Sequence, residues 1–160
     1  MLALADGVTE TVEWVDLDEV VLTEIEAVRT RAVVEVELTP FSTARLRGRS
    51  GELSRVVRNL LDNAERHARR RVTVGLWTAE RFAELVVADD GPGIPESDRT
   101  KVFERFFRTR RALERDSGGV GLGLAIVREM TERHGGQVWL ADSAEGACFH
   151  VRLPLAAAPA

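Results

Sequence analysis

Apolar positions along the chain follow two periods, and the changes from one period to the other predict the elements. A helical period of about 3.6 residues runs from Asp16 to Ala32 and, more strongly, from Gly51 to Arg70. A third helical segment covers Gly121 to His134 and ends at Gly135-Gly136, a common way for a helix to stop. The sequence therefore predicts helices in three places.

Strict alternation of apolar and polar residues predicts the strands between these helices. The expected strands are Val34–Leu38, a short returning strand at Thr43–Arg47, Arg71–Trp77, Phe82–Ala88, and a closing hairpin of Gln137–Ala141 and Cys148–Leu153. We expect an α+β fold: a two-layer sandwich in which a mixed or antiparallel sheet of about five strands packs against about three helices on one face.

The segment from Asp90 to Gly119 follows neither period and has little apolar content outside Val102–Phe107. Such a segment is typical of a functional lid or of disorder, and we expect disorder within Thr109 to Ser117. Arg105 to Arg115 contains five arginines and one glutamate. A solvated charged loop is the ordinary interpretation of this run. Beside a triphosphate, a basic mobile segment could instead screen the phosphates and exclude water.

Length and composition fit a single globular domain. The chain has 160 residues, 44% of them hydrophobic, and a net charge of −4 that gives no indication of a nucleic-acid partner. The lone Cys148 excludes an internal disulfide and a cysteine zinc site, and suits a reducing cytoplasm. No apolar run approaches the roughly 20 residues that span a bilayer. We expect a cytoplasmic domain, although a longer parent could be anchored in the cell membrane.

The first motif with candidate chemistry lies on the strongest predicted helix. A turn of about 100° per residue places Asn59, Asn63 and Arg66 within roughly 60° of one another, at the edge of the apolar face. An asparagine oxygen suits Mg²⁺, and Arg66 could bind phosphate oxygens in bidentate fashion. For an isolated pair of amides, capping of loops or exposure to solvent is the more common role. His67 could pack on a sugar or base, or lie on the helix surface.

The second motif ends an apolar strand, where Asp89 leads into a turn containing Gly91 and Gly93. A carboxylate there could accept a hydrogen bond from an exocyclic amine and so select adenine. The glycines would let a base or sugar approach the backbone. An ordinary Asp-Gly turn at the end of a strand is the alternative.

The third motif, Gly118–Gly123, opens a predicted helix whose free amides could bind phosphate. A dinucleotide fold is excluded, because no strand precedes these glycines and Leu124 breaks the required spacing. No Walker A lysine motif occurs anywhere in the sequence. The two common phosphate-loop classes therefore do not apply.

Taken in order, these blocks resemble the catalytic and ATP-binding domain of sensor histidine kinases, in the Bergerat ATPase superfamily that also contains gyrase and the heat-shock chaperones. Val57–Ala64 resembles the N box of that family and Asp89–Pro95 its G1 box. Val102–Arg108 resembles the F box and Gly119–Val127 the G2 box. Four motifs in the family's order carry the resemblance.

The resemblance implies roles for the matching positions. Asn63 would be the Mg²⁺ ligand, with Asn59 supporting the metal or the phosphates, and Asp89 would bind the adenine amine. Arg108 would approach the γ-phosphate and act in catalysis together with Asn63. The other implied ATP-binding positions are Arg66, His67, Gly91, Gly93, Ile94, Arg105, Gly119, Val120, Gly121, Leu122, Gly123 and Leu124. The phenylalanines Phe103, Phe106 and Phe107 would anchor the lid.

The chain departs from the family in two respects. Cys148 stands where many relatives have Thr or Ser, which puts a hydroxyl-mediated contact to the base in doubt. A histidine followed by an acidic residue, which marks the family's phosphoacceptor site, does not occur in this sequence. The resemblance thus implies a domain that binds Mg-ATP and donates the γ-phosphoryl group to a histidine elsewhere. That histidine would lie on the dimerisation and phosphoacceptor helical hairpin of a parent kinase, in two-component signalling with a response regulator.

The same resemblance implies a division of the chain. Residues 1–10 are interpreted as a remnant of the hairpin or a linker, and residues 11–155 as the catalytic ATP-binding domain, with a lid at about 95–119. Residues 156–160 form a tail. The isolated domain is expected to be monomeric and the parent to be a homodimer.

Asn59 bears on the reaction, because relatives that hydrolyse ATP resemble one another in having a glutamate base there. An amide cannot take a proton from water, so we expect slow hydrolysis. Two alternatives remain: a serine-directed anti-sigma-factor kinase of the same fold, and a nucleotide-binding or docking module without transferase activity.

Overall fold

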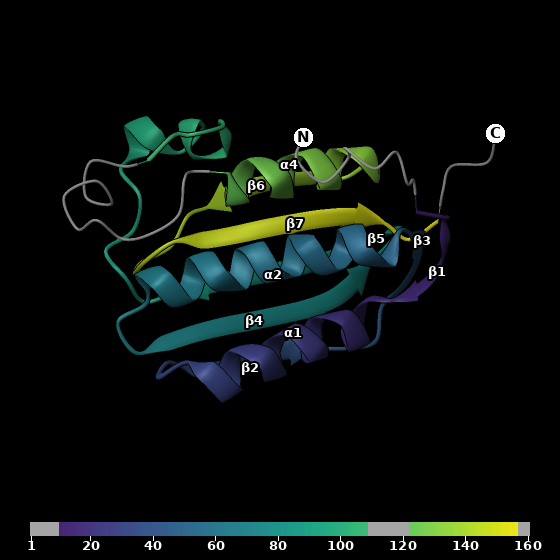
Figure 1. Ribbon diagram of the computed structural model, residues 1–160, viewed down its shortest axis with the longest axis horizontal. Helices are drawn as coiled ribbons and strands as arrows, with labels where there is room; N and C mark the ends of the chain where they lie inside the picture. The colour runs from purple at the N-terminus through teal and green to yellow at the C-terminus, as the bar shows by residue number, and fades with distance from the viewer. Residues whose placement is uncertain (1–9, 109–121, 157–160) are drawn as a thin grey trace.

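The computed structural model describes residues 10–108 and 122–156, and it places five strands in one mixed sheet (Figure 1). These are β2 (Glu35–Phe41), β4 (Arg71–Ala79), β5 (Phe82–Asp89), β6 (Gln137–Ala141) and β7 (Cys148–Pro154), in the spatial order β2-β4-β5-β7-β6. β2 pairs with β4 in parallel, and all other neighbours are antiparallel. The predicted closing hairpin is the pair of β6 and β7.

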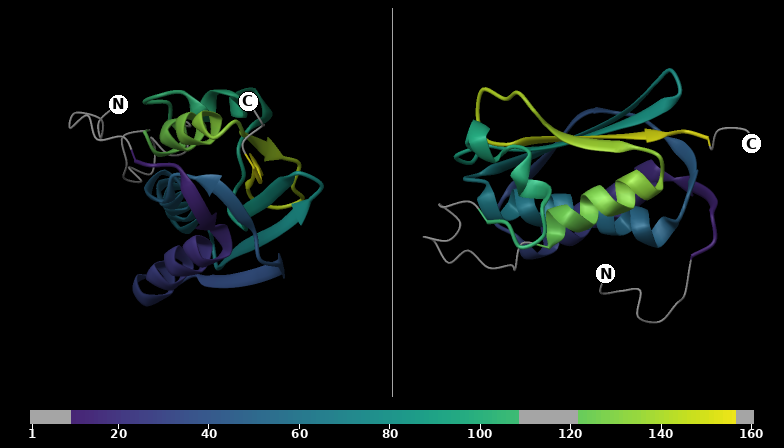
Figure 2. Two further views of the ribbon diagram at one scale, coloured as in Figure 1. Left: turned by 90° about the vertical axis from the view of Figure 1, so that its right-hand side faces the viewer. Right: turned by 90° about the horizontal axis from the view of Figure 1, so that it is seen from above.

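In the described part of the chain, helices cover one face of this sheet, as the two turned views in Figure 2 show. They are α1 (Leu17–Arg31), α2 (Ser50–His67) and α4 (Gly123–Arg133). Two short 3-10 turns, η2 (Glu96–Asp98) and η3 (Lys101–Phe103), lie between β5 and α4 in the chain. The predicted α+β sandwich is confirmed. None of the helices in the described part of the chain is both long and apolar enough to cross a membrane.

The core lies between the helices and the sheet because both contribute a continuous apolar face. On α2 the residues that repeat at helical spacing are almost fully buried, at 0% or 1% exposure: Leu53, Val56, Val57, Leu60, Leu61 and Ala64. The inward positions of β5 and β7 alternate in the same way, with Leu85, Phe149 and Val151 buried. This packing fixes which side of α2 is left for polar residues.

Two details of the strand prediction are wrong. A strand at Glu13–Asp16 (β1) was not predicted, and it pairs with β3 (Arg45–Gly48) in a separate two-stranded sheet rather than extending the main one. β1 has four residues and a single buried side chain, so its alternation is too short to detect. The first predicted strand also continues through Pro40, which is tolerated because β2 lies at a sheet edge, with a register shift between Leu38 and Phe41.

The predicted helix Gly51–Arg70 ends earlier, at His67. The carboxylate of Asp90 accepts the backbone N–H groups of Arg69 (2.7 Å) and Arg70 (3.1 Å), which holds this segment outside the helix. The last turn of α2 is thereby tied to the end of β5, and the N-box helix and the G1 turn meet at one place.

Candidate nucleotide site

The polar edge of α2 carries the two asparagines that the sequence singled out. Asn59 and Asn63 are both half-buried, Arg66 is exposed, and His67 is half-buried at the end of the helix. Among the residues that the structure describes, neither asparagine side chain makes a hydrogen bond. Half-buried amides usually have partners, so this edge is suited to receive polar atoms from outside the chain.

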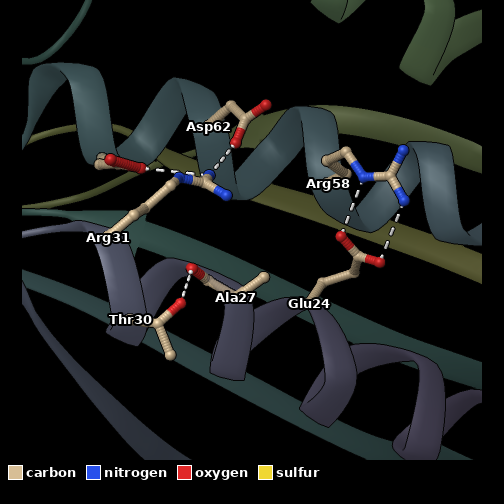
Figure 3. A network of polar contacts seen from close by, with 7 residues as sticks. Glu24, Ala27, Thr30, Arg31, Arg58 and Asp62 are labelled. Carbon is tan, nitrogen blue, oxygen red and sulfur yellow. Dashed lines mark hydrogen bonds and ion pairs between the residues drawn. The ribbon is translucent and has the colours of Figure 1, made fainter.

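The opposite polar edge of α2 is fixed to α1 by ion pairs (Figure 3). Arg58 donates to both oxygens of Glu24, at 3.0 and 3.3 Å, and the hydrogen bond and charge of Glu24 raise the pKa of Arg58. Arg31 contacts Asp62 and, at 3.3 Å, Glu65. These pairs flank Asn59 and Asn63 in the sequence and set the rotation of α2 about its axis.

Asp89 closes the bottom of the site at the end of β5. Its side chain is buried, with 5% of the residue exposed, and Oδ1 accepts N–H groups from Gly91 at 2.8 Å and Ala147 at 3.3 Å. Oδ2 is equally buried and has no hydrogen-bond partner in the described chain. Burial raises the pKa of Asp89, opposed by the two backbone hydrogen bonds. A buried acceptor atom is thus held in place with no donor.

The neighbouring Asp90 has the same side chain as Asp89, but both of its oxygens are bonded to the backbone. Its burial is slight and opposes ionisation, but backbone N–H groups of Arg70, Arg71 and Arg69 outweigh this and lower the pKa of Asp90. All of its described bonds go to the backbone that follows α2. Asp90 therefore holds the loop together, and only Asp89 offers a free oxygen.

Glycines make this arrangement possible by allowing backbone segments to touch. A Cβ on Gly91 would lie 2.1 Å from the carbonyl oxygen of His67, so the G1 turn rests directly on the end of α2. Gly93 and Gly146 both have positive φ, at 78° and 67°. A Cβ on Gly146 would lie 1.8 Å from the carbonyl oxygen of Asp89. Any side chain at these positions would push the floor of the site apart.

Sequence reasoning did not place Gly146 and Ala147 among the site residues. Both come from the turn before β7, and Ala147 supplies one of the two N–H groups that hold Asp89. Cys148 follows them, half-buried opposite Ala88 on β5. Burial, and after it the negative charge of Asp89, raises the pKa of the Cys148 thiol, which keeps it protonated. Ile94, after the G1 turn, packs against the core.

The F box is anchored by two of its three phenylalanines. Phe103 is buried and meets Phe149 of β7 edge to face, with ring centroids 5.9 Å apart, and Phe107 packs on the core. The expectation for Phe106 is wrong: it has a φ of 65° and is 68% exposed. The left-handed backbone turns its side chain outward, and nothing in the sequence indicates such a turn.

Arg105 and Arg108 lie at the border of the described chain. Arg105 is exposed and forms an ion pair with Glu129 of α4 at 3.6 Å, and Arg108 is half-buried with partners of its own. A groove of about 470 Å³ runs between η3 and α4, with Phe103, Arg105 and Glu129 in its walls. No asparagine of α2 and no residue of the Asp89 turn lines this groove, so it is separate from the candidate site at Asp89.

The start of α4 completes the part of the site that the structure describes. Leu122 precedes the helix, and its carbonyl accepts the N–H of Ile126 at 2.9 Å. A Cβ on Gly123 would lie 3.5 Å from Oδ1 of Asn59, so the helix begins beside the N box. Leu124 packs on the core. Gly119, Val120 and Gly121, and the predicted disorder within Thr109–Ser117, fall outside the described residues.

Comparison with known proteins agrees with this geometry. Residues 48–157 match the family of histidine kinase-, DNA gyrase B- and HSP90-like ATPases. The chain is 42% identical over 159 aligned residues to the histidine-protein kinase/phosphatase MprB of Mycolicibacterium vanbaalenii, covering 92% of this chain and 32% of that protein. The sensor histidine kinase CpxA of Escherichia coli is 39% identical over 101 residues, or 63% of this chain and 22% of CpxA.

Solved structures show the same relationship. A mycobacterial sensor histidine kinase MprB structure superposes with a TM-score of 0.81 at 39% identity, covering 90% of this chain and 97% of that one. The ATP-binding domain of PrrB from Mycobacterium tuberculosis gives a TM-score of 0.74 at 28% identity, covering 94% and 100% of the two chains. The chain therefore belongs to the family of histidine kinase-, gyrase B- and HSP90-like ATPases, and its resemblance to the ATP-binding domain of sensor histidine kinases is confirmed. It spans about a third of the length of the mycobacterial MprB proteins that it matches.

Proposed function

We propose that this domain binds Mg-ATP and donates the γ-phosphoryl group to a histidine on a separate dimerisation and phosphoacceptor hairpin of a longer parent kinase. The observation that carries the proposal is Oδ2 of Asp89, a buried acceptor atom without a donor at a floor built from glycines. An exocyclic amine such as that of adenine would supply the missing hydrogen bond. Gly91 and Gly93 let the turn pack closely on the backbone of His67 and Gly146, and this packing would shape the pocket for the base.

The amides of α2 fit the phosphate end of the same ligand. Asn63 would hold Mg²⁺ through its side-chain oxygen, with Asn59 supporting the metal or the phosphates. When bound, Mg²⁺ neutralises phosphate charge as the phosphoryl group departs. Arg66 and Arg108 would supply positive charge to the phosphates, and backbone N–H groups of Gly119–Leu124 would donate to them. His67, Ile94 and Arg105 complete the proposed ligand contacts.

Asn59 directs the reaction toward transfer rather than hydrolysis. A neutral amide has no basic site that could take a proton from an attacking water molecule. The domain would therefore position the phosphoryl group and neutralise its charge, and the nucleophile would come from the parent's hairpin. In this proposal residues 1–10 belong to a remnant of that hairpin or to a linker, residues 11–155 to the catalytic domain, and a response regulator receives the phosphoryl group afterwards. The parent would be a homodimer.

Substitution of Asn63 tests the metal assignment. Asn63→Ala should lower the calorimetric affinity for a Mg-bound, non-hydrolysable ATP analogue by about 100-fold, since the metal loses its protein ligand. Asp62→Ala is the matched control: it removes the adjacent side chain, which points to α1, and should leave the affinity unchanged. An Asn63 variant that binds as tightly as the wild type would refute the assignment.

A transfer assay separates the proposed activity from its alternatives. The domain, with labelled ATP, is mixed with the helical hairpin of a related sensor kinase, and the product is examined for acid-labile, base-stable phosphohistidine. Phosphoserine in a partner protein would identify a serine kinase of the same fold. Binding of ATP without any transfer would favour a nucleotide-binding module.

A further inference from the structure

The N-terminus of α2 is capped by side chains from two distant parts of the chain. The N–H of Arg49, the residue before the helix, donates to Nε2 of His134 at 3.0 Å. The N–H of Gly51 donates to Oε2 of Glu10 at 2.8 Å. Helices usually obtain these two bonds locally, from the cap residue itself and from the glutamate three positions later. Here Arg49 caps with no side-chain bond, and both bonds come from elsewhere.

The local glutamate is present and is used differently. Glu52 occupies the position from which such a side chain normally reaches back to the N–H of Arg49. Its Oε2 instead pairs with Arg133 of α4 at 3.1 Å, and its buried Oε1 has no hydrogen-bond partner among the described residues. His134 has thus displaced the local partner, and both contacts join α2 to the end of α4.

The tautomer of the His134 ring follows from the two groups that it contacts. Arg49 offers an N–H, so Nε2 must accept. Nδ1 lies 2.8 Å from the carbonyl oxygen of Met130 and must therefore carry the proton. The ring is nearly buried, with 3% of the side chain exposed. Gly48 leaves room for it, because a Cβ there would lie 2.9 Å from Cδ2 of His134. The ring has one orientation and one tautomer.

The bond between Arg49 and His134 joins the start of α2 to the end of α4. The helices pack against each other and run in opposite directions, since the end of α4 meets Arg49 while its first residue, Gly123, lies beside Asn59. α4 has 11 residues and is roughly 16 Å long at 1.5 Å per residue. A shift of one residue would displace its first turn by about 1.5 Å and rotate it by about 100°.

From this geometry we propose that His134 is a positioning residue of the ATP site: it sets the register of α4 on the N-box helix and so places the start of α4 against Asn59. The proposal rests on the proposed nucleotide function. Glu10 provides an internal comparison, because it caps the same helix end through the N–H of Gly51 and makes no hydrogen bond or ion pair with α4 among the described residues. Loss of either side chain removes one cap, and loss of His134 also removes one of the two described polar contacts between α2 and the end of α4, the other being the pair of Glu52 and Arg133.

The test uses four variants of the whole chain. His134→Asn keeps a donor for Met130 but cannot reach Arg49, whereas His134→Gln places an acceptor oxygen where Nε2 lies. His134→Ala removes both bonds and Glu10→Ala removes the other cap. We expect His134→Ala and His134→Asn to weaken binding of the Mg-bound ATP analogue by about five- to tenfold, within the range of ordinary coupling between sites. His134→Gln should recover most of this loss, and Glu10→Ala should lower the melting temperature with the affinity unchanged.

A second measurement needs no nucleotide. Hydrogen exchange at the Ile126 amide, in the first turn of α4, should accelerate in His134→Asn and stay at the wild-type rate in Glu10→Ala. If Glu10→Ala weakens binding as much as His134→Asn, or if exchange at Ile126 does not change in His134→Asn, the positioning role is wrong. A wild-type chain that binds no nucleotide would instead overturn the proposed function, and the exchange data would still decide the role of His134.

Discussion

The two polar edges of α2 differ in how completely their side chains are used. On the edge toward α1, Arg58 holds Glu24 through two hydrogen bonds, and Arg31 contacts two carboxylates of α2 (Figure 3). On the edge toward the site, Asn59 and Asn63 make no hydrogen bond within the described chain. Beyond them lies Asp89, with its buried and unpaired Oδ2.

This difference indicates where the helix contributes stability and where it contributes binding. Side chains that already have partners gain nothing from a ligand, and their loss lowers the stability of the fold. Side chains left without partners cost stability in the free protein and repay it when a ligand supplies the missing bonds. The comparison predicts that substitutions on the two edges will affect different measurements.

The largest effect is expected for Asp89→Asn. The substitution places an NH₂ donor where an acceptor is needed, so calorimetric affinity for an ATP analogue should fall by at least about 100-fold. The melting temperature should stay the same or rise, because an unpaired buried carboxylate is removed. A variant that retains its affinity would show that the adenine amine does not bind at Asp89.

Arg58→Ala should have the opposite effects: it should lower stability and leave nucleotide affinity unchanged. It leaves the carboxylate of Glu24, only 11% exposed, without its main partner, and should lower the free energy of unfolding by about 1 to 2 kcal/mol. Urea denaturation measures this loss, and nucleotide affinity should stay within twofold. The double variant Glu24→Gln with Arg58→Met should recover part of the stability, since no buried charge is left unpaired. A large loss of affinity in Arg58→Ala would contradict the separation of the two edges.

The pH dependence of stability should distinguish Asp89 from its substitute. Because burial raises the pKa of Asp89 in the folded state, the folded protein holds this proton at pH values where the unfolded chain has released it. Wild-type stability should therefore fall, relative to Asp89→Asn, as the pH rises from below the ordinary carboxyl pKa through the raised pKa of Asp89. If Asp89 had its ordinary pKa in the folded protein, the free energies of unfolding of the wild type and of Asp89→Asn would not separate in this way over this pH range.

The smallest effect is expected for Arg31→Ala. Its partners Asp62 and Glu65 are partly exposed, so the loss should be about 0.5 kcal/mol and should shrink at high salt. Thermal unfolding at low and high ionic strength measures it. If Arg31→Ala loses as much stability as Arg58→Ala, the ion pairs of Arg31 stabilise the fold as strongly as the pair of Arg58 and Glu24.

The sequence predicts much of the fold because the periodic segments are long. α2 and the pair of β4 and β5 are recognisable from local pattern alone, and so is the closing hairpin. The pattern does not predict β1 because 28 residues, 17 to 44, separate it from its partner β3, and because its own four residues include only one buried side chain. Pairing between distant segments cannot be recognised from the sequence pattern of either segment.

The candidate site likewise has features that the sequence predicts and features that it does not. Spacing on a helix predicts that Asn59 and Asn63 share an edge, and the structure places them so. The distinction between Asp89 and Asp90 cannot be read from two identical residues, because it depends on which backbone N–H groups lie nearby. The contribution of Ala147 and the cap formed by His134 are likewise invisible, since one acts through its backbone and the other reaches across 85 positions.

The edge strand β2 has a consequence for how this domain associates with others. An exposed sheet edge can recruit a strand from another molecule and extend the sheet between copies. β2 opposes this in three ways: Pro40 lacks an N–H, Glu35 carries an exposed negative charge while Glu37 pairs with Arg71 of β4 at 3.4 Å, and the register shifts between Leu38 and Phe41. A second copy that approached this edge would meet negative charge and a broken ladder of donors. This side of the sheet is thereby protected against aggregation.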